Sequence, residues 1–509
     1  ALSAVPKASS ARRRPPLAMR NLVKAIAAML VIVGFASFFM ATDIVEGEPH
    51  IRSAFAGGFV SSTPSHTVHL ASVDGDVMLD SGLDARSLDT SGAQYVGVDG
   101  REHAHIIFST DCGAYQNWQS ELLAFSAQRV GHKGPVTRIA SGCTPEEQEA
   151  LRTRYDTFDL AGLRVHFADA SKKMADGRVY KYFNKPSGLK HWLEYDERLE
   201  GNEVIALLDP DMILMKPFPA HMDPEKDFIR THVPYWDASK APKRIVDGTP
   251  AAQNYGLGSK WVEFNRPYVC GDETSPCVTD FDETNKEDRK RAVAHYAVGP
   301  PYVATRNDFI KIADKWVEFC PKLYEEFAEL LTEMYAYCLA AAHLQMPHFM
   351  VFNWMVSEPG MENREGWPEI DSAAADPNFQ CDASILNTHE TSNIPNILHY
   401  CQKYIAGENQ IWSKHRIPKD IFSCDRELLQ PPPVNAMEYP PGTDVRGRPF
   451  NEKFWRRNTW MACYAYHAMN DALIRFKRAN CDQNANLEET YMIIKMREDC
   501  KGNPNCHNK

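Results

Sequence analysis

Short apolar runs alternate with segments of helical spacing over the first half of the chain. Residues 105–108, 136–139 and 204–208 are mostly apolar runs of four or five residues, the length of buried strands. Residues 115–130 instead place large apolar side chains three and four residues apart, which is helical spacing. Strands that alternate with helices predict an α/β fold with a mostly parallel central sheet flanked by helices.

Two amphipathic helices are predicted further along, over residues 307–320 and 324–342. The apolar stripe of the first consists of Ile310, Ala313, Trp316 and Val317. The apolar stripe of the second consists of Phe327, Leu331, Met334, Cys338 and Ala342. Each stripe predicts a helix with one buried side.

One uninterrupted apolar run determines the expected compartment. Residues 25–42 carry no charge over eighteen positions, near the lower limit of about 17 residues for a membrane-spanning helix. Basic residues precede the run and the first acidic residues follow it, which predicts a cytoplasmic tail (1–24) and a translocated remainder. A cleaved signal peptide is the alternative, but the long basic leader and the length of the run favour an uncleaved anchor. We therefore expect a type II membrane protein that is held in the membrane by one N-terminal helix.

Three further segments follow this predicted anchor. Residues 43–100 are rich in Ser, Gly, Asp and Thr and indicate a stem. Residues 101–435 carry the alternating strand and helix patterns and are the expected catalytic domain. After two proline-rich stretches, residues 436–509 form a helical, Cys-containing extension.

The cysteines support a lumenal location. All 13 of them follow the apolar run, and an oxidising lumen favours disulfide formation. The odd count leaves at least one thiol outside any intramolecular bridge. Cys270 and Cys277 bracket a short polar loop and form the predicted local bridge, whereas no C-x-x-C pair supports a zinc site.

Charge and missing motifs narrow the functional classes. The net charge is −11, from 67 acidic against 56 basic residues, which argues against nucleic acid as the main partner. The sequence has no G-x-x-x-x-G-K-[ST] loop, no G-x-G-x-x-G turn and no H-E-x-x-H helix. P-loop, dinucleotide-binding and zinc-protease chemistry therefore lack their usual signatures.

Asp209-Pro-Asp211 is the sharpest chemical signal. The two carboxylates directly follow the apolar run 204–208, so they are expected at the carboxyl edge of the sheet, where open α/β sheets bind ligands. Carboxylate oxygens suit Mg²⁺ or Mn²⁺, which neutralise charge on a departing diphosphate. An acidic pair in a solvated turn is the alternative for such a short motif.

His399 follows apolar residues in the segment 396–400. A neutral imidazole at this position is able to complete the coordination of a cation. A core histidine that hydrogen-bonds to backbone is the alternative for any isolated histidine.

Several segments carry a resemblance to known enzymes, in one order over roughly residues 103–435. These segments are 115–119, 135–139, 184–186, 191–194, 209–211, 298–301, 333–337 and 397–400. They resemble the plant and algal hydroxyproline O-arabinosyltransferases and the related peptidyl-serine α-galactosyltransferases. The resemblance implies a GT-A-like glycosyltransferase fold, a Golgi membrane location with the catalytic domain in the lumen, and a UDP-sugar as donor.

Carried over position by position, the resemblance implies a set of site residues. Asp209 and Asp211 are then the metal-binding motif, and His399 is its distal partner. The residues expected to bind the donor are Ser109, Thr110, Asp111, Arg138, Asn184, Lys185 and Asp209. Within this set Lys185 is expected to meet phosphate, and the alternative for Arg138 and Lys185 is a surface ion pair.

A second group of residues is assigned to the acceptor side. Glu333 and Tyr337 lie one turn apart on the second predicted helix, off its main apolar stripe, and structural packing is the alternative for both. The insertion 358–384, which contains Trp367 and Asp371, is expected to shape the acceptor groove. We assign Tyr337 and Trp367 to acceptor binding, and Glu333 and Asp371 to stabilising the oxocarbenium-like centre.

The predicted function is a metal-dependent, retaining transfer of a sugar from a UDP-sugar to a hydroxyl of a protein, with Mn²⁺ or Mg²⁺ as cofactor. Arabinose on hydroxyproline is the first choice, and galactose from UDP-galactose on serine is the alternative. Asp209-Pro-Asp-Met212 combines features of both families, Glu-Pro-Asp-His and Asp-Ala-Asp-Met, so the donor stays open. A non-catalytic lumenal sugar-binding scaffold is the more distant alternative.

Overall fold

The computed structural model describes residues 95–493, apart from residues 99, 159, 161, 171–172, 175–176, 200, 224–241, 362–363, 376–378, 392, 408–409, 439–450 and 482–484. All described residues fall within one compact unit, Asp84–Arg497. The predicted cytoplasmic tail, the predicted span at 25–42 and most of the predicted stem lie outside the described residues. Among the helices that are described, none is long and apolar enough to cross a membrane.

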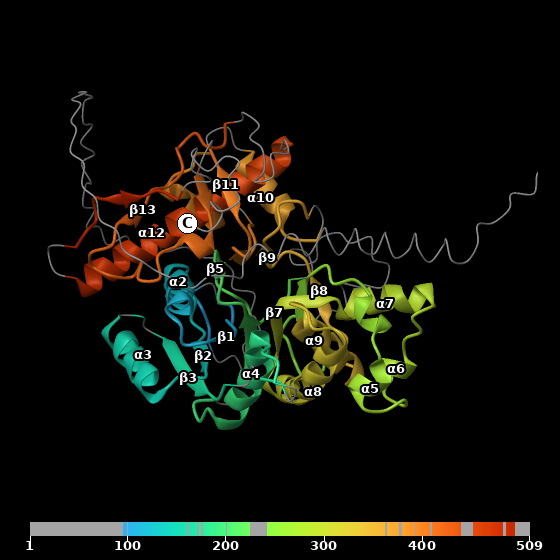
Figure 1. Ribbon diagram of the computed structural model, residues 1–509. Helices are drawn as coiled ribbons and strands as arrows, with labels where there is room; N and C mark the ends of the chain where they lie inside the picture. Colours follow the sequence, from blue (N-terminus) through green and yellow to red (C-terminus); the bar gives the residue numbers. More distant parts are fainter. Residues whose placement is uncertain are drawn as a thin grey trace, which may run out of the picture. The chain divides into compact units, whose positions relative to one another are not determined.

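The central sheet holds seven of the described strands (Figure 1). Their order across the sheet is β3 (Leu163–Ala168), β2 (Val136–Ser141), β1 (His105–Thr110), β4 (Val204–Leu208), β7 (Val298–Thr305), β6 (Ala251–Asn254) and β8 (Phe349–Val351). Six of these strands run in one direction, and β7 runs antiparallel to both of its neighbours. The sheet is therefore mixed but mostly parallel, as the strand and helix alternation predicted.

Strands β1 and β4 position the residues that the sequence singled out. The predicted strand 204–208 matches β4 at both ends, and all five of its residues are buried. Because Phe108 pairs with Leu208 in parallel register, both strands reach the same edge of the sheet. Ser109 and Asp209, which come next in the chain, therefore lie at this carboxyl edge.

Helices surround the sheet, and shorter elements connect them. The described helices are α2 (Ala114–Arg129), α3 (Pro145–Thr157), α4 (Asn184–Tyr195), α5 (Arg266–Cys270), α6 (Pro276–Thr279), α7 (Lys286–Tyr296), α8 (Arg306–Glu326), α9 (Thr332–His343), α10 (Trp367–Ala374), α11 (Thr388–Thr391) and α12 (Glu452–Asn480). The 3-10 turns are η1 (Lys181–Phe183), η3 (Lys260–Glu263), η4 (Ala383–Asn387) and η5 (Lys414–Arg416). The shorter strands are β5 (Met212–Leu214), β9 (Met355–Val356), β10 (Ile397–His399), β11 (Tyr404–Ala406), β12 (Gln410–Trp412), β13 (Leu428–Leu429) and β14 (Thr490–Tyr491).

The two predicted amphipathic helices need correction. The first is α8, which continues to Glu326, and its predicted stripe residue Ile310 is 39% exposed. The second begins at Thr332 instead of residue 324, because the Thr332 hydroxyl donates to the carbonyl groups of Phe327 and Glu329 and closes a turn there. Helix α9 is also buried on every side from Thr332 onward, so it has no exposed polar face.

Helix α12 belongs to the same core as the sheet-covering helix α2. Its apolar side chains share one cluster with those of α2 and of β11, and Figure 1 shows α12 in red beside β11 and α10. Two disulfides, Cys381–Cys463 and Cys424–Cys481, tie it to residues before 436. The predicted boundary at residue 436 therefore does not separate two packed bodies within the described residues.

The described cysteines agree with an oxidising compartment. The predicted bridge Cys270–Cys277 is present, and the other disulfides are Cys112–Cys143 and the two that involve α12. Three described cysteines are free thiols, namely Cys320, Cys338 and Cys401. Disulfides such as the four among the described residues form and persist in oxidising environments.

Candidate metal centre

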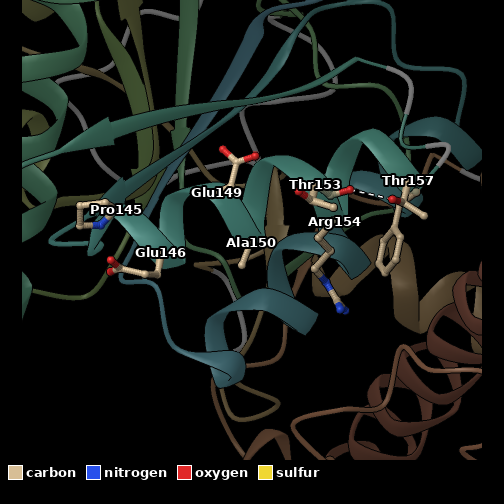
Figure 2. A pocket seen from close by; sticks show the side chains of 8 residues that line it. Pro145, Glu146, Glu149, Ala150, Thr153, Arg154 and Thr157 are labelled. Atoms are coloured by element: carbon tan, nitrogen blue, oxygen red, sulfur yellow. Dashed lines mark hydrogen bonds between the residues drawn. The ribbon is translucent and has the colours of Figure 1, made fainter.

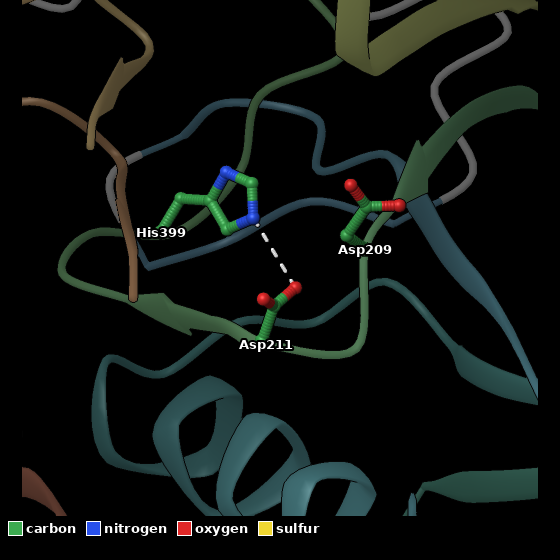
Figure 3. A group of neighbouring side chains, drawn as sticks. All are labelled: Asp209, Asp211 and His399. Carbon is green, nitrogen blue, oxygen red and sulfur yellow. Dashed lines mark hydrogen bonds and ion pairs between the residues drawn. The ribbon is translucent and has the colours of Figure 1, made fainter. Parts of the chain in front are cut away.

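Two carboxylates and one imidazole meet at the carboxyl edge of the sheet. Asp209 and Asp211 follow β4, and the chain then forms β5, which pairs with β10 so that Met212 lies opposite His399. One ligand atom from each of Asp209, Asp211 and His399 lies within 4.8 Å of the others (Figure 3). The predicted convergence of these three side chains is therefore present in the structure.

The donor set fits a divalent cation of the Mg²⁺ or Mn²⁺ type. It offers carboxylate oxygens and an imidazole nitrogen, the ligands that Mn²⁺ accepts. His399 is only 2% exposed, and its Nε2 lies 3.2 Å from Asp211 Oδ1. Its Nδ1 is buried and has no hydrogen-bond partner among the residues that the structure describes, so it is open to a ligand.

Two lysines contact this group, one at each aspartate. Lys185 Nζ lies 2.8 Å from Asp209 Oδ1 and donates to Glu333 Oε1 at 2.9 Å. Lys414 Nζ donates to Asp211 Oδ2 at 2.5 Å. Three carboxyl groups therefore surround two ammonium groups in this cluster.

The charges of this cluster stabilise one another. Burial alone would raise the pKa of Asp211, but Lys414 and His399 outweigh it and hold that pKa well below its usual range. Burial alone would lower the pKa of each lysine, yet Asp209 and Glu333 raise the pKa of Lys185, and Asp211 raises that of Lys414. Both lysines and Asp211 are consequently ionised at neutral pH.

Glu333 is held rigidly but is only half satisfied. Its backbone N–H donates to the Tyr180 hydroxyl at 2.9 Å, and its carbonyl accepts from Trp316 Nε1 at 2.6 Å. Its side chain is 5% exposed, and within the described part of the chain its buried Oε2 has no hydrogen-bond partner. Burial raises the pKa of this carboxyl group, against the opposing effect of Lys185. Glu333 is thus a positioned carboxylate with a spare acceptor, at the site and not on an exposed face.

The carboxyl end of β1 lies against the first turn of α4. Ser109 Oγ donates to the carbonyl of Asn184, the first residue of α4, at 3.3 Å. Gly188 lets α4 come this close, since an added Cβ would lie 2.9 Å from Ile139 Cγ2. The disulfide Cys112–Cys143 then joins the loops that follow β1 and β2. Ser109, Asn184 and Lys185 therefore lie together, as predicted, whereas their contacts with a donor stay a prediction.

Arg138 has a different role from the predicted one. It is fully buried in β2, so it is neither a surface ion pair nor open to a donor. Its guanidinium donates to Thr110 Oγ1 and to the carbonyl of Asp111, both at 2.8 Å. It also donates to the Tyr155 hydroxyl at 2.5 Å. Arg138 consequently holds the loop after β1 in place from behind.

Three residues assigned to the acceptor or to catalysis make structural contacts. Tyr337 is fully buried, stacks on Tyr302 with ring centroids 4.1 Å apart, and therefore cannot reach an acceptor. Trp367 is fully buried as well, and its indole N–H donates to the Glu358 carbonyl and to Glu365 Oε2.

The third of these residues is Asp371. It receives two hydrogen bonds from the buried Arg457 on α12, at 2.8 and 2.6 Å. This ion pair fixes α10 to α12, and no hydrogen bond or ion pair that the structure describes links Asp371 to Asp209, Asp211 or His399. These contacts give Asp371 a structural role, and its assignment to catalysis stays a prediction.

Lys414 is the site residue that the sequence reasoning missed. It lies on η5, just after β12, and contacts a carboxylate that is 203 positions earlier in the chain. A weak local signal existed, since Ser413-Lys414 directly follows the short buried strand β12, as Asp209 follows β4. That signal is too common to identify a site by itself.

A surface depression lies elsewhere and carries no comparable chemistry. An open hollow of about 820 Å³ borders one side of α3, where Figure 2 shows Glu149, Ala150 and Thr153 along the helix. Its cationic group, Arg154, is already bound by the buried Glu121 at 2.5 and 2.9 Å. The edge of the sheet, where charged groups converge, is therefore the better candidate for chemistry.

Fold and site together define a class: an α/β protein with a carboxylate–imidazole group for a divalent cation at the carboxyl edge of its sheet. The chain is similar to the peptidyl serine α-galactosyltransferase of Chlamydomonas reinhardtii, with 33% identity over 351 residues, 67% of this chain and 40% of that one. It is also similar to the Arabidopsis thaliana protein of the same description, with 27% identity over 267 residues, 51% of this chain and 29% of that one. The resemblance to this plant and algal superfamily, predicted from the sequence, is confirmed. The chain spans well under half the length of either relative.

Comparisons with family models and solved structures add less. No family model matches the chain. The WbbM bifunctional glycosyltransferase matches with a TM-score of 0.31 and 8% identity, over 59% of this chain and 46% of that one. The galactosyltransferase LgtC matches with a TM-score of 0.28 and 12% identity, over 58% and 87%. The glycosyltransferase GlyE of Streptococcus pneumoniae matches with a TM-score of 0.27 and 13% identity, over 59% and 55%. These TM-scores are too low to establish a shared fold.

Proposed function

We propose that this protein is a metal-dependent, retaining glycosyltransferase that moves galactose from UDP-galactose to serine side chains of a protein. The observation that carries the proposal is the convergence of Asp209, Asp211 and His399 at the carboxyl edge of the sheet. The two relatives described as peptidyl serine α-galactosyltransferases favour galactose and serine over arabinose and hydroxyproline. The GT-A-like character of the fold is part of the same proposal.

Some of the site residues would act on the diphosphate of the donor, and Glu333 would act on its sugar ring. Asp209, Asp211 and His399 would hold Mn²⁺ or Mg²⁺, which when bound supplies positive charge beside the leaving diphosphate. Lys185 lies against Asp209 and Glu333, so its ammonium is positioned to meet phosphate oxygens. Glu333 presents its spare acceptor Oε2 from a backbone fixed by Tyr180 and Trp316, where a carboxylate stabilises positive charge on the sugar ring.

The compartment is part of the proposal. We infer a Golgi membrane protein of type II topology, anchored by residues 25–42, with the sheet and its site in the lumen. The charge-free run with basic residues on one side supports this topology. The four disulfides support the lumenal side, since the cytosol keeps thiols reduced.

The test is release of UDP by the full chain from a panel of UDP-sugars. The assay runs with and without Mn²⁺, and with serine-containing and hydroxyproline-rich peptides. We expect Mn²⁺-dependent release from UDP-galactose that the serine peptide stimulates. Asp211→Ala should lower the rate by more than about 100-fold, above the usual effect of residues that only support a metal ligand.

The matched control is Asp420→Ala, which removes an exposed aspartate that contacts only Arg426 among the hydrogen bonds and ion pairs described. This variant should keep full activity. Release from a UDP-arabinose with the hydroxyproline peptide would instead establish the arabinosyl alternative. No release from any donor, by a chain whose thermal unfolding shows it to be folded, would point to a non-catalytic sugar-binding scaffold.

A further inference from the structure

Lys414 places a second ammonium group at the metal centre, from a segment that none of the expected site residues occupies. Its Nζ lies 2.5 Å from Asp211 Oδ2, on the carboxylate that Lys185 does not contact. We propose that Lys414 binds the diphosphate of the donor, and that it makes cation binding and donor binding depend on one another. This inference rests on the proposed function, because it needs a donor with a diphosphate.

The position of Lys414 fits a diphosphate ligand. Its side chain is 19% exposed, and those of Lys185 and Asp209 are 11% and 19% exposed, so each reaches the surface of the site. The next residue, His415, stacks on Tyr115 in the first turn of α2, with ring centroids 5.7 Å apart and planes at 5°. That turn follows Ser109–Asp111, the predicted nucleotide side. Lys414 thus lies between the nucleotide side and Asp211, where a diphosphate would join the two.

The charges give this lysine two opposite effects. Its ammonium repels a divalent cation held by Asp211, since both are positive and both bind the same carboxylate. A diphosphate reverses the balance, because it is anionic and attracts the cation and both lysines. Lys414 therefore weakens binding of the cation alone and strengthens binding of cation and nucleotide together.

These two effects predict changes of opposite sign for one variant. In Lys414→Met, the dissociation constant of Mn²⁺ alone should fall by about threefold or more, because Asp211 loses a competing positive charge. With saturating Mn²⁺, the dissociation constant of UDP should rise by about tenfold, the effect of losing one charge-assisted hydrogen bond. Isothermal titration calorimetry of the full chain measures both, and electron paramagnetic resonance of free Mn²⁺ checks the first.

Lys419→Met is the matched control, since it removes the same charge from an exposed position five residues further on. Neither dissociation constant should change in this variant. Lys414→Arg keeps the charge, and its dissociation constant for Mn²⁺ should stay near that of the wild type.

The outcomes separate this inference from the proposed function. A misfolded Lys414→Met chain would bind both Mn²⁺ and UDP more weakly, so weaker binding of Mn²⁺ overturns the inference and makes Lys414 structural. Wild-type binding of UDP together with unchanged constants in Lys414→Met also overturns it, and leaves the transferase proposal standing. Failure of the wild-type chain to bind any uridine diphosphate, with or without Mn²⁺, overturns both.

Discussion

Two buried glutamates in this protein have similar exposure and opposite surroundings. Glu333 is 4% exposed and Glu365 is 5% exposed, and burial raises the pKa of both. Glu365 lies between β9 and α10, where both of its oxygens accept hydrogen bonds, from the Ser357 N–H and hydroxyl, the Glu358 N–H and the Trp367 indole. Glu333 has Lys185 on one oxygen and no partner on the other.

The difference separates structural from functional polar groups. A buried polar group normally has its hydrogen bonds satisfied, because an unsatisfied one costs about 1–3 kcal/mol. Glu365 follows this rule, since both of its oxygens accept hydrogen bonds. The region around Glu333 breaks it twice, at Glu333 Oε2 and at His399 Nδ1. Unsatisfied atoms beside paired charges are typical of a site prepared for a ligand.

Among the variants that test this comparison of two glutamates, Glu333→Gln is expected to have the largest effect. The amide keeps the shape of the side chain but removes the negative charge, so turnover should fall by about 100-fold, as for loss of one electrostatic group in an active site. Stability should not fall, because Lys185 keeps its contact with Asp209 and a desolvated charge is removed. Steady-state rates and the midpoint of urea unfolding measure the two properties. Near-normal turnover would remove Glu333 from the chemistry.

The sequence was sufficient for the parts of the site that local pattern determines. Asp209 and Asp211 follow a strand whose five apolar residues predict its two ends, and the structure has β4 at those residues. The disulfide Cys270–Cys277 spans a short loop, so spacing alone predicted it. His399 needed the resemblance as well, because an isolated histidine has no pattern of its own.

The remainder depended on tertiary contacts that no local pattern encodes. Lys414 meets Asp211 across 203 positions, and nothing near it in the sequence marks that contact. Tyr337 and Trp367 were assigned to an acceptor, but an aromatic ring with one polar atom suits a core equally well. The prediction of an amphipathic helix at α9 was wrong for a related reason. Periodicity indicates a helix with one apolar side, but this helix is buried on all sides.

An effect of intermediate size is expected from Glu365→Gln, and it should concern only the pH dependence of stability. Burial outweighs its hydrogen bonds and raises the pKa of this carboxyl from 4.5 to about 7. The folded state therefore binds the proton more tightly, and the stabilisation is complete below pH 4.5 and lost as the pH rises to about 7. The loss is on the order of 3 kcal/mol, from about 1.4 kcal/mol for each pKa unit.

Glu365→Gln should remove this part of the pH dependence. Urea unfolding of both proteins at pH 5 and pH 7.5 measures it, and the wild type should lose more stability between the two values than the variant does. Turnover at a fixed pH should differ little, because no hydrogen bond or ion pair that the structure describes joins Glu365 to the metal group. If the free energy of unfolding changes equally in the two proteins between pH 5 and pH 7.5, Glu365 is ionised in the folded protein throughout this range.

The smallest effect is expected from Tyr337→Phe, which tests whether a satisfied buried group near the site matters to function. Burial lowers the pKa of His348 to about 3, so its imidazole is neutral. Its Nδ1 lies 3.1 Å from the Met346 carbonyl and donates to it, so Nε2 accepts from the Tyr337 hydroxyl at 2.8 Å. Removing that hydroxyl should cost about 1 kcal/mol of unfolding free energy, the value of one hydrogen bond. The KM for the peptide acceptor should not change, since the ring stays in the core. A raised KM with unchanged stability would instead support the predicted role of Tyr337 in acceptor binding.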